Sequence, residues 1–481
     1  MKRRKFFVLA SSCAAGLALA SSCKGSKSES EFTENSETSN LSLGKEPSYR
    51  KTIKTSFSSG TPKSASDSIV VALIGAGLWG SILIKQASET GENILVKYIC
   101  DVDDTKGGHA ISELEKKQGF KPIRVRDMRK VFDDKEVDAV FIATPEHWHA
   151  LATIWACQAG KDVYVEKCIS HNITEGQKMI EATMKYERVV QCGTFNRSTP
   201  EALTARDYIK SGELGDLVAV HVKSMLPGPI PFTKKDETVA PNTIDWDLWL
   251  GPAPKAPYSV SRNKSWHYYW DYGSGNAMGN EAIHQLDLAR LVLDNPGLPS
   301  SVYCTGGRYF FNDDRDVPDY QLAYFDCDNY VMTLQAGDCV SYLGKSGPEI
   351  RYGNEFPNWS HNGTHVEIIG TKRMMYVGRM GGGWQVFDKG GEVVAGQTSY
   401  YPLKAHLLNF LDCVRTRKQP NSNIVEGHNS SILIHLANLS YRTGSKQLRF
   451  SPQSETILND SKAQEMISCH YRKGFEIPTE V

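Results

Sequence analysis

The chain has 481 residues, of which 40% are hydrophobic and 23% charged, and its lysines and arginines equal its acidic residues in number. This length is too great for one ordinary core and predicts two domains. The composition is that of a globular protein, and the balanced charge gives no support for nucleic-acid binding.

The N-terminus has the pattern of an export signal. Basic residues at 2–5 precede an apolar stretch over 6–20, too short to span a bilayer, and small residues lead to Cys23. Arg3 and Arg4 resemble a twin-arginine signal, and "ALASSC" resembles a lipobox that would place a lipid on Cys23. We expect a signal peptide over 1–23, a periplasmic or membrane-anchored lipoprotein, and a flexible linker over the Ser-, Lys-, Glu- and Thr-rich residues 24–67.

A glycine motif follows the first predicted strand. The β-branched run "SIVVALIGAG" predicts a buried parallel strand, and "LWGSILIKQASETG" predicts a helix. Gly75, Gly77 and Gly80 lie between them with G-x-G-x-x-G spacing, and Asp101 ends the next strand-like run, 21 residues beyond Gly80. This pattern predicts a dinucleotide whose pyrophosphate lies at the helix N-terminus, near Leu78 and Trp79. A turn with a purely structural role is the alternative.

Acidic residues favour NAD over NADP. Asp101 is placed to meet the adenosine ribose hydroxyls, and together with Asp103 and Asp104 it would repel a 2′-phosphate.

The alternation of strands and helices continues. Strand-like runs over 139–145, 162–169 and 188–195 are separated by helical patterns over 147–160 and 174–187. They predict a doubly wound parallel sheet over 68–195. Ligands collect at the carboxyl ends of such strands, so Thr144, Pro145 and His149 are expected near the cofactor.

A metal site is not expected. The eleven cysteines form no C-x-x-C pair, and most lie in apolar runs where free thiols are buried. His147 and His149 have no third ligand in view, so a loop that lines the nicotinamide or substrate is the favoured interpretation.

These motifs, together with "TPEHWH", "VEKC", "YWDYGSGNAMGNEAIHQLDLARLV" and the C-terminal "HLLNFLDCVRTRKQPNSNIVEGHNSSILIHLANLSYRTG", resemble the Gfo/Idh/MocA family, named for glucose–fructose oxidoreductase and inositol dehydrogenase. The resemblance implies an α/β protein with an N-terminal Rossmann domain over 68–195. A second α/β domain with an open, mostly antiparallel sheet would follow over 196–400. The final helices and tail, 401–481, would pack back on the first domain, and a homo-oligomer is implied.

The resemblance also implies a catalytic site. The family's E-K-P motif corresponds to Glu166, Lys167 and Cys168, which places Glu166 and Lys167 beside the nicotinamide, although Cys168 replaces the proline. The family's second motif has an Asp four residues before a His; His284 matches the histidine, but Asn280 replaces the acid. An amide can bind a sugar hydroxyl but cannot take its proton, so proton transfer is assigned to His284 and Lys167. The alternative for His284 is a structural histidine that is buried in the core and makes its hydrogen bonds there.

Further polar and aromatic residues are candidates for the site. Asp287 lies about one helical turn beyond His284 and is predicted to orient its imidazole. Trp266 and Tyr268, in the aromatic segment 262–273, are placed to stack on a pyranose ring or to pack beneath the sheet. Arg197, just after the last Rossmann strand, is placed to bind substrate hydroxyls.

The leading hypothesis is an exported oxidoreductase that transfers hydride between a secondary hydroxyl of a carbohydrate or polyol and a tightly held NAD. One alternative is a glycoside hydrolase that oxidises its substrate transiently, eliminates, adds water and reduces again. A second is a sugar-binding lipoprotein without catalysis.

Overall fold

The computed structural model describes residues 46–51, 53–58, 63–64, 66–228 and 237–481. The predicted signal peptide and Cys23 lie outside these residues. The linker prediction is wrong for 46–51 and 53–58: Tyr49 and Phe57 are buried in the first core, and the short helix η1 (Ser48–Lys51) contacts α5 (Ile173–Lys185). Tyr49 and Phe57 bury enough apolar surface to anchor these residues, although the average composition of 24–67 is polar.

The first sheet has six parallel strands in the order β3-β2-β1-β4-β5-β6. The strands are β1 (Ile69–Ile74), β2 (Ile94–Cys100), β3 (Ile123–Val125), β4 (Ala139–Ile142), β5 (Asp162–Val165) and β6 (Val190–Cys192). Every residue of β4, β5 and β6 is buried, as expected for parallel strands covered on both faces. The strand order reverses between β1 and β4, which is where doubly wound sheets bind their ligands.

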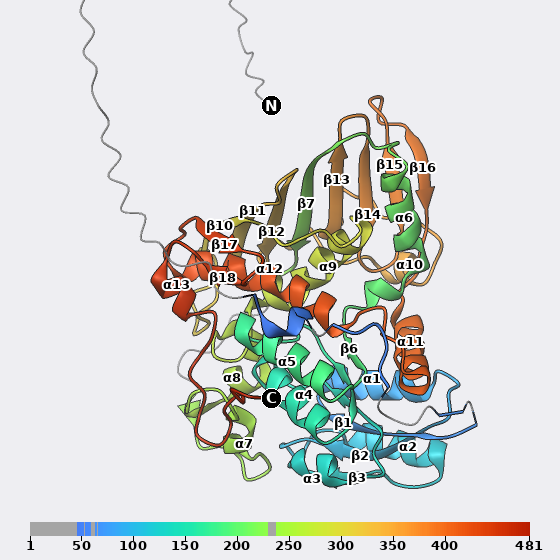
Figure 1. Ribbon diagram of the computed structural model, residues 1–481, viewed down its shortest axis with the longest axis vertical. Helices are drawn as coiled ribbons and strands as arrows, with labels where there is room; N and C mark the ends of the chain where they lie inside the picture. Colours follow the sequence, from blue (N-terminus) through green and yellow to red (C-terminus); the bar gives the residue numbers. More distant parts are fainter. Residues whose placement is uncertain (1–45, 52, 59–62, 65, 229–236) are drawn as a thin grey trace, which may run out of the picture. The chain divides into compact units, whose positions relative to one another are not determined.

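Helices cover both faces of this sheet. They are α1 (Leu78–Ser88), α2 (Gly108–Gln118), α3 (Arg129–Asp133), η2 (Glu146–Trp148), α4 (His149–Gln158) and α5. Helices α1 and α2 pack against each other, as do α4 and α5 (Figure 1). Because the connections run in opposite directions from β1, the two helix pairs lie on opposite faces. The strands and helices predicted over 68–195 are thereby confirmed.

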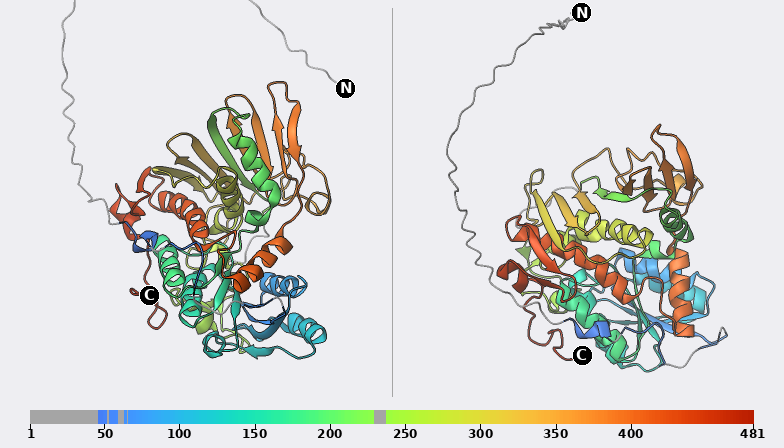
Figure 2. Two further views of the ribbon diagram at one scale, coloured as in Figure 1. Left: turned by 45° about the vertical axis from the view of Figure 1, so that its right-hand side comes forward. Right: turned by 45° about the horizontal axis from the view of Figure 1, so that its top comes forward.

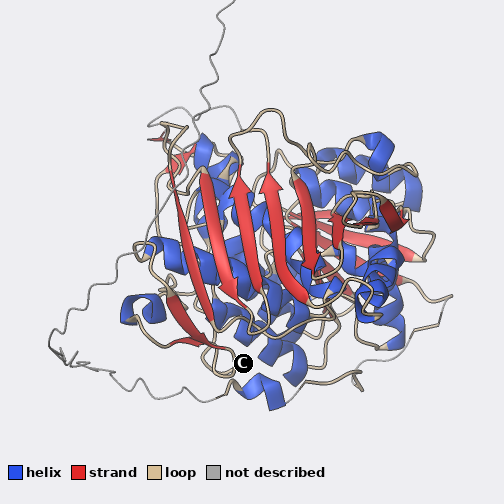
Figure 3. Cartoon of the chain, turned by 90° about the horizontal axis from the view of Figure 1, so that it is seen from above, coloured by secondary structure: helices blue, strands red, loops and turns tan. Residues whose placement is uncertain are grey.

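The second sheet has ten strands in the order β16-β15-β14-β13-β7-β12-β11-β10-β17-β18, and among its pairs only β7 with β12 is parallel. Its strands are β7 (Leu217–Met225), β10 (Ser301–Gly307), β11 (Tyr320–Asp326), β12 (Val331–Gly337), β13 (Thr364–Gly370), β14 (Met374–Gly378), β15 (Trp384–Phe387), β16 (Val393–Gln397), β17 (Leu448–Ser451) and β18 (Thr456–Ile457). Burial alternates along β11 and β12, so only one face meets the core. Figure 3 shows the helices behind this sheet and its other face open toward the viewer. The predicted fold class is confirmed.

Helices α6 (Pro200–Lys210), α9 (Ile283–Val292) and α12 (Ile424–Arg442) contact the second sheet. A π-helix, η5 (Gly275–Ala282), runs directly into α9. The shorter elements are η3 (Phe195–Ser198), β8 (Glu237–Thr238), α7 (Trp246–Leu250), β9 (Tyr258–Ser259), α8 (Val260–Lys264), η4 (Trp266–Tyr268), α10 (Pro348–Arg351) and α13 (Ser461–Glu465).

Within the described ranges, every helix is too short or too polar to traverse a lipid bilayer. The cysteines of these ranges are free and mostly buried.

The C-terminal segment divides between the two cores, which differs from the expectation that all of 401–481 packs on the first domain. Helix α11 (Leu403–Thr416) places Leu407 and Phe410 in the first core. Helix α12 instead places Ile432 and Leu436 in the second core, and β17 joins the second sheet. Figure 2 shows α12 running between the two sheets.

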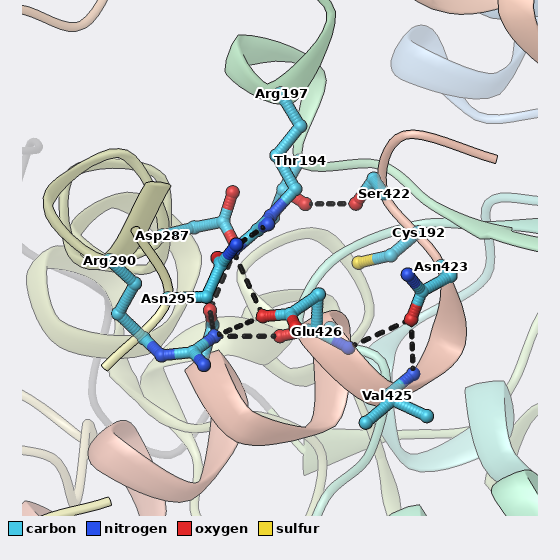
Figure 4. Close-up of polar contacts among 12 residues, drawn as sticks. Cys192, Thr194, Arg197, Asp287, Arg290, Asn295, Ser422, Asn423, Val425 and Glu426 are labelled. Carbon is cyan, nitrogen blue, oxygen red and sulfur yellow. Dashed lines mark hydrogen bonds and ion pairs between the residues drawn. The ribbon is translucent and has the colours of Figure 1, made fainter. Parts of the chain in front are cut away.

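A buried charge network fixes the N-terminal end of α12 (Figure 4). The Arg197 guanidinium donates to Asp287 Oδ1 at 2.8 Å, and Arg290 donates to Glu426 Oε2 at 2.9 Å. Arg197 also reaches Glu426 at 3.3 Å, and the Ser430 hydroxyl donates to Asp287 Oδ1 at 2.8 Å. Glu426, in the first turn of α12, therefore forms ion pairs with two arginines from two other elements, and Asp287 is the second carboxylate of the network.

Replacing Glu426 with glutamine is expected to lower the free energy of unfolding by about 2 kcal/mol. In this variant the buried guanidinium groups of Arg197 and Arg290 are left with Asp287 as the one carboxylate of the network. This value is discounted because the Glu426 side chain is 20% exposed. Thermal and denaturant unfolding of the variant measure the change. Glu392→Gln, at an exposed site beside β16, is the control and is expected to change stability by less than about 0.5 kcal/mol. Equal stability of the two variants would contradict this role of Glu426.

Candidate active site

A cleft of about 600 Å³ opens at the carboxyl ends of the first-sheet strands and reaches η5 and α9. Every residue predicted to hold the cofactor lines it, together with three of those predicted for substrate. They are Gly75, Gly77, Leu78, Trp79, Gly80, Asp101, Thr144, Pro145, His149, Glu166, Lys167, Trp266, Asn280 and His284.

The three motif glycines have three different physical roles. Gly75 has φ of +89°, and a Cβ there would lie 2.6 Å from the Ala143 carbonyl oxygen. A Cβ on Gly80 would lie 2.0 Å from the Gly75 oxygen, so helix and strand approach closely at this point. A Cβ on Gly77 would meet nothing within 4 Å. The turn thus leaves unoccupied space beside Gly77 and the first backbone N–H groups of α1. The first turn of α1 has no acidic residue, so this space suits the negative charge of a pyrophosphate.

Asp101 is fixed at the edge of the same cleft. Its Oδ2 accepts from the Ala76 backbone N–H at 2.7 Å, and its Oδ1 accepts from the Asp103 N–H at 2.9 Å. A carboxylate held beside the glycine turn suits ribose hydroxyls and opposes a 2′-phosphate.

A segment of the second domain is bonded to the loop that follows Asp101. The Asp104 N–H donates to the Thr243 oxygen at 2.9 Å, and the Asp245 N–H donates to the Val102 oxygen at 2.9 Å. The side chains of Ile244, Leu248 and Trp249 line the cleft from this segment. The cofactor region is therefore bounded by both domains.

Lys167 lies two residues beyond the end of β5, and its side chain connects the two domains. Its ammonium group donates to Asn280 Oδ1 at 2.6 Å and to the Asn280 carbonyl oxygen at 2.9 Å. Asn280 Nδ2 donates to Asn276 Oδ1 at 3.1 Å, and Asn276 Nδ2 donates to Asp338 Oδ2 at 3.2 Å. These hydrogen bonds orient the Asn280 side chain so that its amide oxygen faces the Lys167 ammonium group. The peptide bond between Lys167 and Cys168 is cis.

His284 lies in the first turn of α9 with its ring against Phe195, the two centroids 4.6 Å apart. It is 2% exposed, and its Nδ1 has no hydrogen-bond partner among the described residues. Burial, with the positive charges of Arg379 and Lys167, holds the pKa of His284 well below its ordinary value. The imidazole is therefore neutral, whereas an unperturbed histidine titrates near neutral pH.

Three charged residues that the sequence motifs did not mark stand next to His284. Glu281 forms ion pairs with the Lys345 ammonium and, at 2.9 Å, with the Arg379 guanidinium. Burial alone would raise the pKa of Glu281, but the charges of Arg379 and Lys345 lower it to about 2. Glu281 and Lys345 line the cleft.

Three predicted site residues do not line the cleft. Asp287 does not orient His284: its Oδ1 accepts from the Arg197 guanidinium (Figure 4) and from the Ser430 hydroxyl. Arg197, only 5% exposed, serves that network and does not face a substrate. Tyr268 is buried under the Arg315 guanidinium, which lies 4.6 Å from its ring centroid, so of the two predicted aromatics only Trp266 borders the cleft.

The two histidines of "TPEHWH" bind backbone carbonyl groups. His147 Nε2 lies 3.1 Å from the Trp249 oxygen, and His149 lies 2.6 Å from the Cys168 oxygen through Nδ1. Burial lowers the pKa of His147 to about 3 and that of His149 to about 4, so both rings are neutral. Over the described ranges, no three His, Cys, Asp or Glu side chains are grouped as a metal site.

Two family models match the chain. The model described as "Oxidoreductase family, NAD-binding Rossmann fold" matches residues 69–194. The model described as "Oxidoreductase family, C-terminal alpha/beta domain" matches 230–304 and 393–477. Together the two models cover more than half of the chain.

The protein belongs to the Gfo/Idh/MocA oxidoreductase family. Its first domain is accordingly the NAD-binding domain of that family, as the glycine turn and Asp101 predicted.

Curated Gfo/Idh/MocA relatives match the chain over part of their length. A levoglucosan dehydrogenase of Pseudarthrobacter phenanthrenivorans is 27% identical over 180 residues, which are 37% of this chain and 39% of the relative. An inositol 2-dehydrogenase of Salmonella typhimurium is 27% identical over 182 residues, which are 37% of this chain and 53% of the relative. The chain thus spans between two fifths and about half of the length of these two relatives.

Solved structures share the fold over most of the chain. Levoglucosan dehydrogenase in complex with NADH and levoglucosan has a TM-score of 0.57 and 18% identity, covering 80% of this chain and 99% of that one. An aldose-aldose oxidoreductase from Caulobacter crescentus, complexed with glycerol, has a TM-score of 0.58 and 15% identity, covering 80% of this chain and all of the other. At this identity the likeness establishes the two-domain fold.

Proposed function

We propose that the protein is an oxidoreductase that transfers hydride between a secondary hydroxyl of a carbohydrate or polyol and a tightly held NAD. The observation that carries the proposal is one continuous cleft, lined at one end by the glycine turn and Asp101 and at the other by Lys167, Asn280 and His284. The curated relatives named above are dehydrogenases of a sugar derivative and of inositol, which supports this substrate class.

Gly75, Gly77 and Asp101 would hold the dinucleotide, which would supply the hydride acceptor for oxidation of the hydroxyl-bearing carbon to a carbonyl carbon. The chain's own residues manage the proton. His284, which is neutral, accepts the hydroxyl proton, while the Lys167 ammonium donates a hydrogen bond to the same oxygen and stabilises its developing negative charge. Asn280 positions Lys167 for this contact.

Enclosure supports retention of the cofactor through turnover. The segment 243–249 is hydrogen-bonded to the loop after Asp101 and lines the cleft with Ile244, Leu248 and Trp249. Contacts on two sides of the cleft would slow the release of a bound nucleotide. A second substrate or an electron acceptor would then regenerate the cofactor in place.

The test is to denature purified protein, identify the released nucleotide, and assay monosaccharides, polyols and glycosides for ketone formation and for bond cleavage in parallel. We expect released NAD and a keto product with matching NADH formation. Release of an aglycone without net NADH would instead favour a glycosidase with transient oxidation. Binding of sugars with no change in nicotinamide absorbance would favour a protein without catalysis.

We also propose that the protein is exported, attached to a membrane through a lipid on Cys23, and homo-oligomeric. The basic, apolar and small-residue pattern of 1–23 supports export and lipidation. Cell fractionation of the full chain and of Cys23→Ala tests the attachment: the variant is expected in the soluble periplasmic fraction, and an unchanged distribution would contradict lipid anchoring.

The pH dependence of turnover tests the state of His284. Because the pKa of His284 lies well below its ordinary value of 6.5, its basic form persists as the pH falls, and kcat/KM is expected to decline only well below pH 6.5. Arg379→Met removes one positive charge and leaves Glu281 less neutralised; both changes raise the pKa of His284. The acidic limb of the pH–rate profile is therefore expected to move upward in this variant. An acidic limb at or above pH 6.5 in the parent protein would contradict the assignment.

A further inference from the structure

Three charged residues of the second domain form one ion-pair cluster at the cleft, where Glu281 and Lys345 line it. Lys345 and Arg379 both pair with a single carboxylate, that of Glu281. His284 is neutral because its pKa is lowered by burial and by the charges of Arg379 and Lys167. Within this ion-pair cluster, two positive charges thus share one negative charge.

Two carboxylates of the first domain are bonded outside this cluster. Glu166 accepts from Trp79 Nε1 at 2.7 Å, and Glu146 accepts from the Ser274 backbone N–H at 3.1 Å. Both lie near Lys167, whose positive charge lowers their pKa against the stronger effect of burial. Neither carboxylate forms an ion pair with Lys345 or Arg379, so among the described residues Glu281 is the carboxylate that these two cations share.

An unbalanced charge away from water is costly unless a partner compensates it. Arg379 is 4% exposed, and its Nε has no hydrogen-bond partner among the described residues. Burial and the charge of Arg379 lower the pKa of Lys345, while Glu281 opposes them. A neutral polyol could satisfy hydrogen bonds here, but it would leave the two cations sharing one carboxylate.

We propose that the substrate carries an anionic group, a carboxylate or a sulfate ester, which binds beside Lys345 while the reacting hydroxyl lies at Lys167 and His284. This inference rests on the proposed function and narrows its substrate class to acidic sugars. Lys345 is the group that can reach the ligand: it lines the cleft, its side chain is 31% exposed, and its ammonium has donors beyond the one given to Glu281. Arg379 keeps Glu281 paired when Lys345 turns toward the ligand.

The test uses matched pairs of sugars on the NAD-loaded protein. D-glucuronate is compared with D-glucose, D-galacturonate with D-galactose, and glucose 6-sulfate serves as the sulfate arm. Calorimetry or quenching of tryptophan fluorescence measures binding, and ketone formation measures kcat/KM. We expect at least one anionic sugar to bind about tenfold or more tightly than its neutral partner. Preference for the uronates assigns a carboxylate, and preference for glucose 6-sulfate alone assigns a sulfate ester.

Lys345→Met keeps the length of the side chain and removes its charge. In this variant the preference is expected to fall to about twofold or less, while NAD content is unchanged. Lys404→Met, at an exposed site on α11, is the control and is expected to keep the preference. Equal binding of charged and neutral sugars, or no binding of any of them at about 10 mM, overturns the inference. Efficient oxidation of neutral sugars alone would overturn it and leave the proposed function standing, whereas absence of NAD from the protein would remove the proposed function itself.

Discussion

Replacing Lys167 with methionine is expected to slow ketone formation by about 10³-fold while NAD remains bound. The ammonium group is the cation placed between the two domains, and its present acceptors are the oxygens of Asn280. Methionine fills similar space but cannot donate to an oxygen that gains negative charge as hydride leaves. Single-turnover absorbance at the nicotinamide wavelength measures the step, and nucleotide released on denaturation measures cofactor content.

The control for this variant is Lys116→Met, which removes an exposed lysine from α2 and is expected to leave turnover unchanged. His284→Gln tests the same site and is also expected to slow ketone formation, because glutamine can hydrogen-bond the hydroxyl but cannot take its proton. Full activity of Lys167→Met with normal cofactor content would show that the ammonium group has no part in the reaction. Loss of NAD together with activity would assign Lys167 to binding.

The predicted residues that line the cleft belong to short, contiguous patterns of the sequence. Gly75, Gly77 and Gly80 lie in one strand–turn–helix unit, so spacing and strand composition suffice to place them at the cleft. Lys167 and His284 were placed by family motifs that tolerate the departures at Cys168 and Asn280. Both side chains line the cleft.

The errors arise where distant segments compete for the same side chain. Helical spacing places Asp287 near His284, but Arg197 and Ser430, far away in the chain, bind its carboxylate. No local pattern marks Lys345, in the connection between β12 and α10, or Arg379, directly after β14. Only the strand order of the second sheet brings these two residues to Glu281, and single-sequence patterns do not determine that order.

The glycine turn provides a variant that separates cofactor binding from folding. Substituting Gly75 would strain a backbone at φ of +89°, and a side chain on Gly80 would press on the Gly75 oxygen, so both changes threaten the fold. Gly77 has φ of −64°, which any residue can adopt, and a Cβ there meets no protein atom within 4 Å. Of the three glycines, Gly77 is therefore the one at which a side chain can enter the cleft without displacing the protein around it.

Gly77→Val is thus expected to fold with near-normal stability and to bind NAD at least about 100-fold more weakly, because its side chain occupies the space where the pyrophosphate approaches the backbone. Thermal unfolding checks the fold, and nucleotide content with calorimetric titration of NAD checks binding. Gly297→Val is the control: this exposed glycine also has no atom within 4 Å of a Cβ, but it does not line the cleft. If Gly77→Val retained NAD as tightly as the control, the dinucleotide would have to bind elsewhere. The roles given to Lys167, His284 and Lys345 would then be contradicted, because all three assume a cofactor in this cleft.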